Sequence, residues 1–195
     1  MNASATLRDV IGLDNTLPRL GETTLILIDF QNTYRTGVMA LDGAEPALAA
    51  GARLLAAARA AGTPVVHVMD AGYDISSELG AISPEVAAAD GEPVVVKQVP
   101  NAFHSTDLEK TLRDLGAGPD LVLAGFMTHM CVTFTAQGAF NLGYRPTVVA
   151  EATATRSLPA PDGSTLPAAT LQAASLTTIA DLFGPVAPTV EHLTG

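Results

Sequence analysis

The sequence predicts an α/β fold in which a mostly parallel sheet is covered by helices on both faces. Short runs rich in Val, Ile and Leu alternate along the chain with longer segments of helical periodicity. These runs are apolar throughout, as expected of strands that are buried on both faces. The 195 residues are 48% hydrophobic and 15% charged, a composition typical of a globular protein with a large core.

The first half of the chain is expected to supply three strands and one long helix. The run TTLILIDF is apolar until it ends in a carboxylate, which is typical of a buried strand. The alanine-rich segment that follows has apolar residues at helical spacing and is stopped by a glycine and a proline. In order, we expect a strand at 23–30, a helix at 45–62, a strand at 64–69, a long loop at 70–93 and a strand at 93–97.

The second half continues this alternation. The first helix there is expected to open with a capping box formed by Thr106 and Glu109 and to end at a glycine. The last helix is expected to stop at a Gly-Pro pair. In order, we expect a helix at 106–116, a strand at 120–126, a helix at 131–142, a strand at 145–153 and a helix at 167–184.

The chain is expected to form a single domain over residues 1–195, with residues 1–20 as an N-terminal extension. These first residues lack a cationic segment followed by an apolar run, so no signal peptide is expected. No apolar stretch approaches the roughly 18 residues of a membrane span, so no membrane partner is expected. One cysteine cannot form an internal disulfide, which favours a cytoplasmic location. A net charge of −10 without a cluster of Lys and Arg argues against nucleic acid as a partner.

Three reactive side chains stand at or just beyond the ends of predicted strands, namely Asp29, Lys97 and Cys131. Right-handed crossovers place the carboxyl ends of parallel strands at one edge of the sheet, where α/β proteins bind ligands. The fold is therefore expected to gather these three groups in one crevice. A carboxylate, an ammonium group and a thiol together are suited to nucleophilic catalysis.

The expected roles follow from the chemistry of each group. Lys97 and the start of the helix at 131–142 are expected to favour the thiolate of Cys131. Asp29 is expected to accept the thiol proton, to pass it to a leaving amine and then to activate water. Backbone N–H groups around 127–131 are expected to stabilise the negative charge that develops on the attacked carbonyl.

Each of the three residues also has a plain structural interpretation, which the sequence leaves open. A lone cysteine between a strand and a helix is more often a small buried residue. An aspartate at a strand end often shapes a turn, and a lysine there is usually solvated. The combination of the three is what favours a function.

The stretches that carry these residues resemble the isochorismatase-like cysteine hydrolase superfamily. The spacing between the stretches matches as well, and the resemblance runs from about residue 22 to most of the remaining chain. The matching stretches are LILIDFQNTY (25–34), VVKQVPNAFHSTDLE (95–109), LVLAGFMTHMCVTFTA (121–136) and TVVAEATATRSLP (147–159).

The resemblance implies a three-layer α/β/α domain of Rossmann-like topology with a six-stranded, mostly parallel sheet. It also implies an Asp-Lys-Cys triad formed by Asp29, Lys97 and Cys131. A cis peptide bond between Phe126 and Met127 is implied too, with the N–H groups of Met127 and Cys131 forming the oxyanion hole. Members of the superfamily form homo-oligomers, so a dimer or a tetramer is expected.

The retained cysteine implies the branch that hydrolyses C–N bonds of small amides, carbamoyl compounds, ureido compounds and lactams through a thioester. Two other functions stay open. One is a vinyl-ether hydrolase of the isochorismatase type, in which Asp29 protonates the substrate and Cys131 is dispensable. The other is a catalytically inactive ligand-binding scaffold. A thiol pKa at or above its ordinary value of about 8.5 favours these two.

No metal site and no cofactor are expected. Nicotinamidases of this superfamily build a metal site from an Asp-x-His element and a further histidine after the second strand. Here that region, VVHVMDAGYDISSELG (65–80), has only His67, which lies inside the predicted strand. Relatives also carry an arginine where this chain has Gln137, so a carboxylate or subunit contact made by that arginine is expected to be lost.

Six residues near the triad are candidates for contact with a small-molecule substrate. Core packing is an equal alternative for Phe30, and Gln31 is more readily explained as holding the backbone or Asp29. His104 could equally face solvent, and Thr128 could bond the loop backbone. The candidates are Phe30, Gln31, Tyr34, Phe103, His104 and Thr128.

Overall fold

A computed structural model describes residues 4–194 and confirms the predicted α/β architecture. Its main sheet has six strands, all parallel, in the order β3-β2-β1-β4-β5-β8. The two central strands, β1 and β4, are buried along nearly their whole length, as their continuous apolar sequences require. The strands are β1 (Thr24–Ile28), β2 (Val65–Asp70), β3 (Val94–Lys97), β4 (Asp120–Phe126), β5 (Arg145–Ala154) and β8 (Val186–Ala187).

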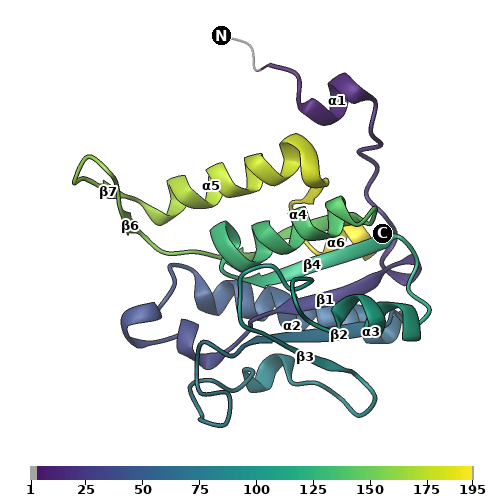
Figure 1. Ribbon diagram of the computed structural model, residues 1–195, viewed down its shortest axis with the longest axis horizontal. Coiled ribbons are helices and arrows are strands. Elements are labelled where there is room, and N and C mark those ends of the chain that lie inside the picture. Colours follow the sequence, from purple (N-terminus) through teal and green to yellow (C-terminus); the bar gives the residue numbers. More distant parts are fainter. Residues whose placement is uncertain (1–3, 195) are drawn as a thin grey trace.

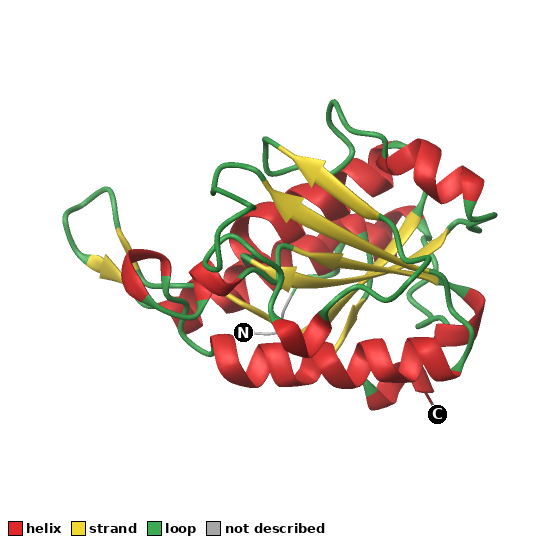
Figure 2. Ribbon diagram, turned by 90° about the horizontal axis from the view of Figure 1, so that it is seen from below, coloured by secondary structure: helices red, strands yellow, loops and turns green. Residues whose placement is uncertain are grey.

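Helices cover both faces of this sheet and complete the three layers (Figures 1 and 2). The long helix α2 packs on one face, against alternate residues of β1, β4 and β5. Three helices pack on the other face, against the intervening residues of the same strands. The helices are α2 (Ala44–Ala60) on the first face and α3 (Leu108–Asp114), α4 (Thr133–Asn141) and α5 (Ala168–Thr178) on the second. None of the helices in the described range is long and apolar enough to cross a bilayer.

Several elements were not predicted from the sequence because they are short. The sixth strand, β8, is two residues long, and α6 (Glu191–Thr194) is a single turn. A hairpin of β6 (Leu158–Pro159) and β7 (Thr165–Leu166) projects beyond the end of α5 (Figures 1 and 2). Segments this short have too few residues for a period to be recognised.

The predicted capping box at the start of α3 is wrong. The helix begins at Leu108, and Asp107 stands at the N-cap position without a side-chain hydrogen bond. The hydroxyl of Thr106 instead donates to the carbonyl of Ala102 at 2.5 Å and accepts the N–H of Leu108 at 3.2 Å. Ser105 has a left-handed φ of 55°, and this turn directs Thr106 back onto its own loop.

Two other predicted helices have different limits because each includes a π-helical turn. The helix predicted at 131–142 begins with a π turn at Thr128–Val132 and ends as α4. The helix predicted at 167–184 ends as a π turn at Ile179–Phe183. Such turns insert one extra residue per turn and frequently occur at functional sites.

The predicted N-terminal extension packs against the C-terminal part of the chain; its residues 1–3 lie outside the described residues. A short helix, α1 (Leu7–Ile11), is capped by Thr6 and bonded through the N–H of Leu7 to Asp181 at 2.9 Å. The guanidinium of Arg8 is buried and donates to the carbonyl of Leu182. These contacts fix the extension at the side of the domain opposite the strand carboxyl ends.

Glycine is required at the end of β4. Gly125 has a φ of 133°, and a Cβ atom at this position would lie 1.9 Å from the carbonyl oxygen of Ile28. Backbone cannot move away from such a contact without breaking the pairing of β1 with β4. The two strands that end at the predicted site therefore approach each other closely there.

Replacing Glu92 by glutamine is expected to destabilise the fold by roughly 1–3 kcal/mol, because its carboxylate accepts charge-assisted hydrogen bonds. Arg59 of α2 binds it through two nitrogens at 2.8 Å, and buried His67 of β2 lies 2.8 Å away. The Arg59 hydrogen bonds in particular lower the pKa of Glu92 from 4.5 to about 2. A folded-state pKa below the unfolded one stabilises the fold above pH 4.5, and this is lost as pH falls toward about 2.

Urea unfolding of wild type and Glu92→Gln at neutral pH and at two acidic pH values measures this effect. The stability difference is expected to be largest at neutral pH and to shrink as the wild-type carboxylate is protonated. A difference that stayed constant down to pH values near 2 would show that charge has no part in it.

Candidate active site

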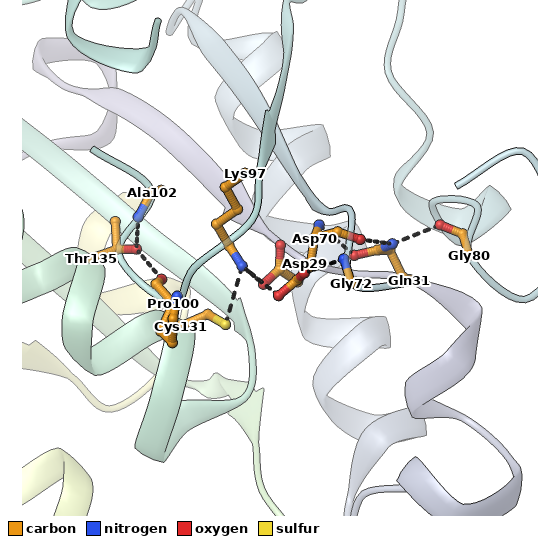
Figure 3. A network of polar contacts seen from close by, with 10 residues as sticks. All are labelled: Asp29, Gln31, Asp70, Gly72, Gly80, Lys97, Pro100, Ala102, Cys131 and Thr135. Atoms are coloured by element: carbon orange, nitrogen blue, oxygen red, sulfur yellow. Dashed lines mark hydrogen bonds and ion pairs between the residues drawn. The ribbon is translucent and has the colours of Figure 1, made fainter. Parts of the chain in front are cut away.

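The fold brings Asp29, Lys97 and Cys131 together at the carboxyl edge of the sheet (Figure 3). Asp29 directly follows β1, Lys97 is the last residue of β3, and Cys131 lies in the π turn after β4. The ammonium nitrogen Nζ of Lys97 lies 2.8 Å from Oδ2 of Asp29 and 3.3 Å from Sγ of Cys131. The three groups form one contact cluster, as the strand topology predicted.

Burial makes the charges of this cluster depend on one another. Asp29 is completely buried, and Lys97 and Cys131 are 1% and 3% exposed. A buried ammonium group requires a counter-ion, which Asp29 supplies. The alternative interpretation of Lys97, as a lysine exposed to solvent at the end of a strand, is therefore wrong.

Asp29 has the properties of a base that operates near neutral pH. Burial raises the pKa of its carboxyl group from 3.8 to about 6, although the Lys97 ammonium opposes this rise. Neither carboxylate oxygen of Asp29 has a well-aligned hydrogen bond from another described residue. Its contact with Lys97 is therefore an ion pair. Both oxygens remain available to accept a proton. The backbone of Asp29 is left-handed, with a φ of 51°, a conformation that aspartate tolerates better than most residues.

Lys97 favours the thiolate of Cys131, as expected, but burial outweighs this effect in the resting site. Burial has the largest effect and raises the pKa of the Cys131 thiol, and the nearby Asp29 carboxylate raises it further. Lys97 lowers the pKa of the thiol, but this effect is smaller than the combined effect of burial and Asp29. The thiol is therefore protonated at neutral pH, and a thiolate must form by transfer of its proton to a neighbour. Oxygens of Asp29 and Asp70 and Sγ of Cys131 all lie within 4.8 Å of one another.

The turn that carries Cys131 begins with an unusual backbone geometry. The peptide bond between Phe126 and Met127 is cis, and the π turn starts at the next residue. The carbonyl of Met127 accepts the N–H groups of Met130 and Val132. Its own N–H makes no hydrogen bond to another residue in the described part of the chain.

The next helix is fixed to the loop that follows the lysine. The hydroxyl of Thr135 in α4 accepts the N–H of Ala102 at 3.1 Å and reaches the carbonyl of Pro100 at 3.4 Å (Figure 3). The sequence does not predict this contact, because a threonine inside a helix gives no signal of it. The contact links the Cys131 segment to the Lys97 segment.

Two of the six substrate-contact candidates, Phe30 and Tyr34, belong to a cluster of aromatic side chains close to Asp29. Phe30 packs edge-on against Phe126 with ring centroids 4.7 Å apart, and Tyr34 contacts Phe126 at 5.8 Å. Tyr34 in turn contacts Tyr73, which is half-buried in the loop after β2. Burial and the charge of Asp29 raise the pKa of the Tyr34 hydroxyl, which places this ring near the base.

Gln31 and Thr128 are both completely buried. The Gln31 side chain bonds the N–H and the carbonyl of Asp70 and the carbonyl of Gly80 (Figure 3). These are the backbone contacts that the sequence favoured for it over a contact with substrate. The hydroxyl of Thr128 is buried without a hydrogen-bond partner among the described residues.

The other two candidates lie in the loop after β3. The ring of Phe103 stacks on Tyr144 with centroids 5.7 Å apart. His104 is exposed, and its N–H donates to the carbonyl of Asn101. His129, in the π turn that also carries Cys131, contacts the hydroxyl of Thr155 at 2.5 Å.

A third charged residue of the site, Asp70, was not predicted from the sequence. Its Oδ2 lies 2.8 Å from Nζ of Lys97, so that the ammonium is bound between two carboxylates. Asp70 ends β2 in the same way that Asp29 follows β1, but the predicted strand stopped one residue short of it. The signal was therefore present in the run VVHVMD. Asp29, Asp70 and Cys131 could together ligate a cation, but the Lys97 ammonium already bonds all three.

Two cavities of the described chain lie away from the triad. One, of about 530 Å³, lies at the amino ends of the strands between the N-terminal extension and the start of β5. Another, of about 320 Å³, lies beside the start of α2 and the end of β5. The triad itself is closed, and Asp70, with 19% of its side chain exposed, is the member of the charged cluster nearest to solvent.

Comparison with solved structures identifies a protein of closely similar fold. The chain superposes on a crystal structure of an isochorismatase from Pseudomonas putida KT2440 with a TM-score of 0.92 and 39% sequence identity. The match covers 97% of this chain and 99% of that chain. It confirms the predicted isochorismatase-like fold over nearly the whole length.

Comparison with curated sequences identifies relatives of several kinds. The chain is 31% identical to the secreted isochorismatase effector Isc1 of Verticillium dahliae, covering 92% of this chain and 95% of the relative. It is 30% identical to the ureidoacrylate amidohydrolase RutB of Stutzerimonas stutzeri, covering 69% and 71%. The family model of the isochorismatase domain matches residues 23–191. On this match and on the geometry of the three buried groups, the chain belongs to the isochorismatase family of hydrolases.

Proposed function

We propose that this protein hydrolyses the C–N bond of a small amide, carbamoyl or ureido compound or lactam through a thioester on Cys131. The observation that carries the proposal is the contact of one buried ammonium group with both a carboxylate and a thiol. Amidohydrolases among the relatives support the same class of reaction.

The first half of the reaction forms the thioester. The Cys131 thiol gives its proton to Asp29, and the thiolate attacks the carbonyl carbon of the substrate. This transfer leaves the sum of charges on the two groups unchanged, so no additional charge has to be buried. The Lys97 ammonium lies beside both groups and stabilises whichever of them is negative. The raised pKa of Asp29, about 6, suits a group that must take a proton near neutral pH.

The second half releases the amine and the acid. The tetrahedral intermediate carries its negative charge on the former carbonyl oxygen, which the N–H groups of Met127 and Cys131 stabilise. The N–H of Met127, which makes no hydrogen bond to the described residues, supports this assignment. Asp29 then protonates the leaving nitrogen as the C–N bond breaks. Finally it takes a proton from water, and the resulting hydroxide attacks the thioester carbonyl carbon. The C–S bond breaks, the acid leaves, and Asp29 returns the proton to sulfur, which regenerates the thiol.

The substrate enters a site lined by this cluster of aromatic side chains. Phe30 and Tyr34 are its predicted inner wall, and their edge-on contacts with Phe126 and, for Tyr34, with Tyr73 support this placement. The low exposure of the triad means that the loop carrying Tyr73 has to move for a substrate to enter. Phe103, His104 and Thr128 remain predicted substrate contacts.

The test is a screen of small amides, ureas and lactams for release of ammonia or amine, with Cys131→Ala as the control protein. The proposal requires at least one compound that wild type cleaves and the control does not. Release of amine by both proteins at equal rates would contradict it.

The pH dependence offers a further check on Asp29. For a cleaved compound, kcat/KM is expected to rise tenfold per pH unit below about 6 and to level off above it, because Asp29 must be ionised to act as a base. The measurement is kcat/KM against pH at constant ionic strength. An acidic limb near pH 4, the range of an ordinary carboxyl group, would contradict the assignment.

A vinyl-ether hydrolase remains the second candidate, and the raised pKa of the Cys131 thiol favours it. A carboxyl group with a pKa of about 6 is partly protonated near neutral pH and can donate a proton to an ether substrate. Isochorismate is the compound to test, and turnover that survives Cys131→Ala would support this function over the first.

The assembly and the location are also proposals. We propose a single catalytic domain that forms a homo-oligomer, and the exposed apolar residues of the edge strand β3, Val94 and Val96, support a subunit contact there. The cytoplasm remains the predicted location.

A further inference from the structure

The carboxylate of Asp70 is positioned by the sheet itself. Asp70 and Lys97 are the last residues of β2 and β3 and are direct partners in the parallel register. The N–H of the next residue, Ala71, bonds the carbonyl of Lys97 at 2.8 Å. Their side chains therefore extend from one edge, and Oδ2 of Asp70 meets Nζ of Lys97 at 2.8 Å (Figure 3).

Other contacts hold Asp70 in this place. Gln31, which is completely buried, accepts the N–H of Asp70 at 2.8 Å and donates to its carbonyl at 3.2 Å. The second carboxylate oxygen, Oδ1, accepts the N–H of Gly72 at 2.7 Å. A buried glutamine two residues after the catalytic base thus fixes the backbone of a second carboxylate that also contacts the catalytic lysine.

The proposed reaction requires a negative charge that stays next to the Lys97 ammonium. Asp29 is the counter-ion of Lys97 in the resting site, but Asp29 becomes neutral each time it accepts a proton. In the tetrahedral intermediate the Cys131 sulfur is bonded to carbon and carries no charge either, and the negative charge lies on the former carbonyl oxygen. A buried ammonium without a counter-ion is strongly unfavourable, so another anion must remain next to Lys97 through that stage.

We propose that Asp70 is a positioning residue of the active site, the permanent counter-ion that holds the Lys97 ammonium in place while Asp29 gains and loses its proton. This inference rests on the proposed function for the order of proton transfers. Its geometric part, the bridge from Asp70 through Lys97 to Asp29 and Cys131, does not depend on the substrate.

The charge of Asp70 acts on the catalytic groups through this bridge. It contributes to the raised pKa of Asp29, after the larger effect of burial. The other groups that face Asp29 are Lys97 from β3, Cys131 from the π turn and the Tyr34 hydroxyl from the segment after β1. Neutralising Asp70 removes one negative charge from this cluster, which favours the ionised forms of both Asp29 and Cys131.

The test follows ionisation of the single thiol by its thiolate ultraviolet absorbance against pH, referenced to Cys131→Ser. Asp70→Asn is expected to lower the midpoint by about one pH unit, and Asp70→Glu to keep it near wild type. The matched control is Asp74→Asn, because Asp74 accepts an N–H two residues on, as Asp70 does, but is exposed. A merely structural role of Asp70 would leave all midpoints equal, and that result would overturn the proposal.

A second variant covers the case in which Asp70→Asn does not fold. A Cβ atom on Gly72 would lie 3.0 Å from Oδ1 of Asp70, so Gly72→Ala displaces the carboxylate without removing its charge. A smaller shift of the midpoint in the same direction is expected, and an unchanged midpoint would count against the proposal. Since the titration uses no substrate, its failure together with Cys131-dependent turnover would remove only the role of Asp70. A shifted midpoint with Cys131-independent turnover would remove only the proposed function.

Discussion

Replacing Cys131 by alanine is expected to lower kcat/KM for a cleaved amide by about 10⁴-fold or more, while the protein keeps its fold. The reason is that no other described side chain beside Lys97 is a sulfur nucleophile, and water at the site would have to attack without a covalent intermediate. Cys131→Ser is expected to be similarly impaired, because a buried hydroxyl gives up its proton far less readily than a thiol. Steady-state kinetics on the same compound measure both variants.

Stability has to be compared beside the activity of these variants. Loss of one buried sulfur atom is expected to lower the free energy of unfolding by about 1 kcal/mol, which a urea titration resolves. Folded protein with undiminished turnover would show that the thiol is dispensable and would favour the ether hydrolase. A variant that binds a compound of the screen but cleaves nothing would agree with the proposed role.

Replacing Asp29 by asparagine is expected to have opposite effects on turnover and on the thiol. Turnover should fall by about 10²- to 10⁴-fold, since no base remains to take the thiol proton. The pKa of Cys131 should fall, because the Asp29 carboxylate that raises it is removed while the Lys97 ammonium that lowers it remains. Asparagine tolerates the left-handed backbone at this position, so the fold is expected to survive. The rate of Cys131 alkylation by iodoacetamide near neutral pH should therefore increase as catalysis is lost.

Asp120→Asn is the matched control, because Asp120 pairs with Arg145 at the opposite edge of the sheet. It is expected to change neither turnover nor alkylation. Slower alkylation in Asp29→Asn would mean that the carboxylate assists the thiol only as a base. Unchanged turnover would remove Asp29 from the mechanism altogether.

The sequence was sufficient for the architecture because buried strands and long helices carry strong periodic signals. The continuous apolar runs around Ile26 and Leu123 predicted the two central strands, and their alternation with helices predicted the parallel order. The N-terminal helix and the hairpin after β5 were missed, because tertiary contacts hold them rather than local pattern. The contact of Leu7 with Asp181 joins residues 174 positions apart, and no local rule anticipates it.

For the site, the sequence predicted which residues meet but not their protonation. Strand ends alone suggested Asp29, Lys97 and Cys131, and the resemblance to the family strengthened that choice. The state of the thiol depends on burial, which outweighs the lysine charge and is a property of the folded surroundings. Asp70 was overlooked for a simpler reason, because a one-residue error in a strand end moved a carboxylate from the sheet edge into a loop.

The central claim, that Cys131 forms a covalent bond with the carbonyl carbon of the substrate, is tested most directly by mass spectrometry of rapidly quenched turnover. With a cleaved amide in excess, the account predicts an adduct on Cys131 with the mass of the acyl portion, formed together with the free amine and before the acid. Turnover that proceeds at the full rate without any adduct on Cys131 would contradict the account.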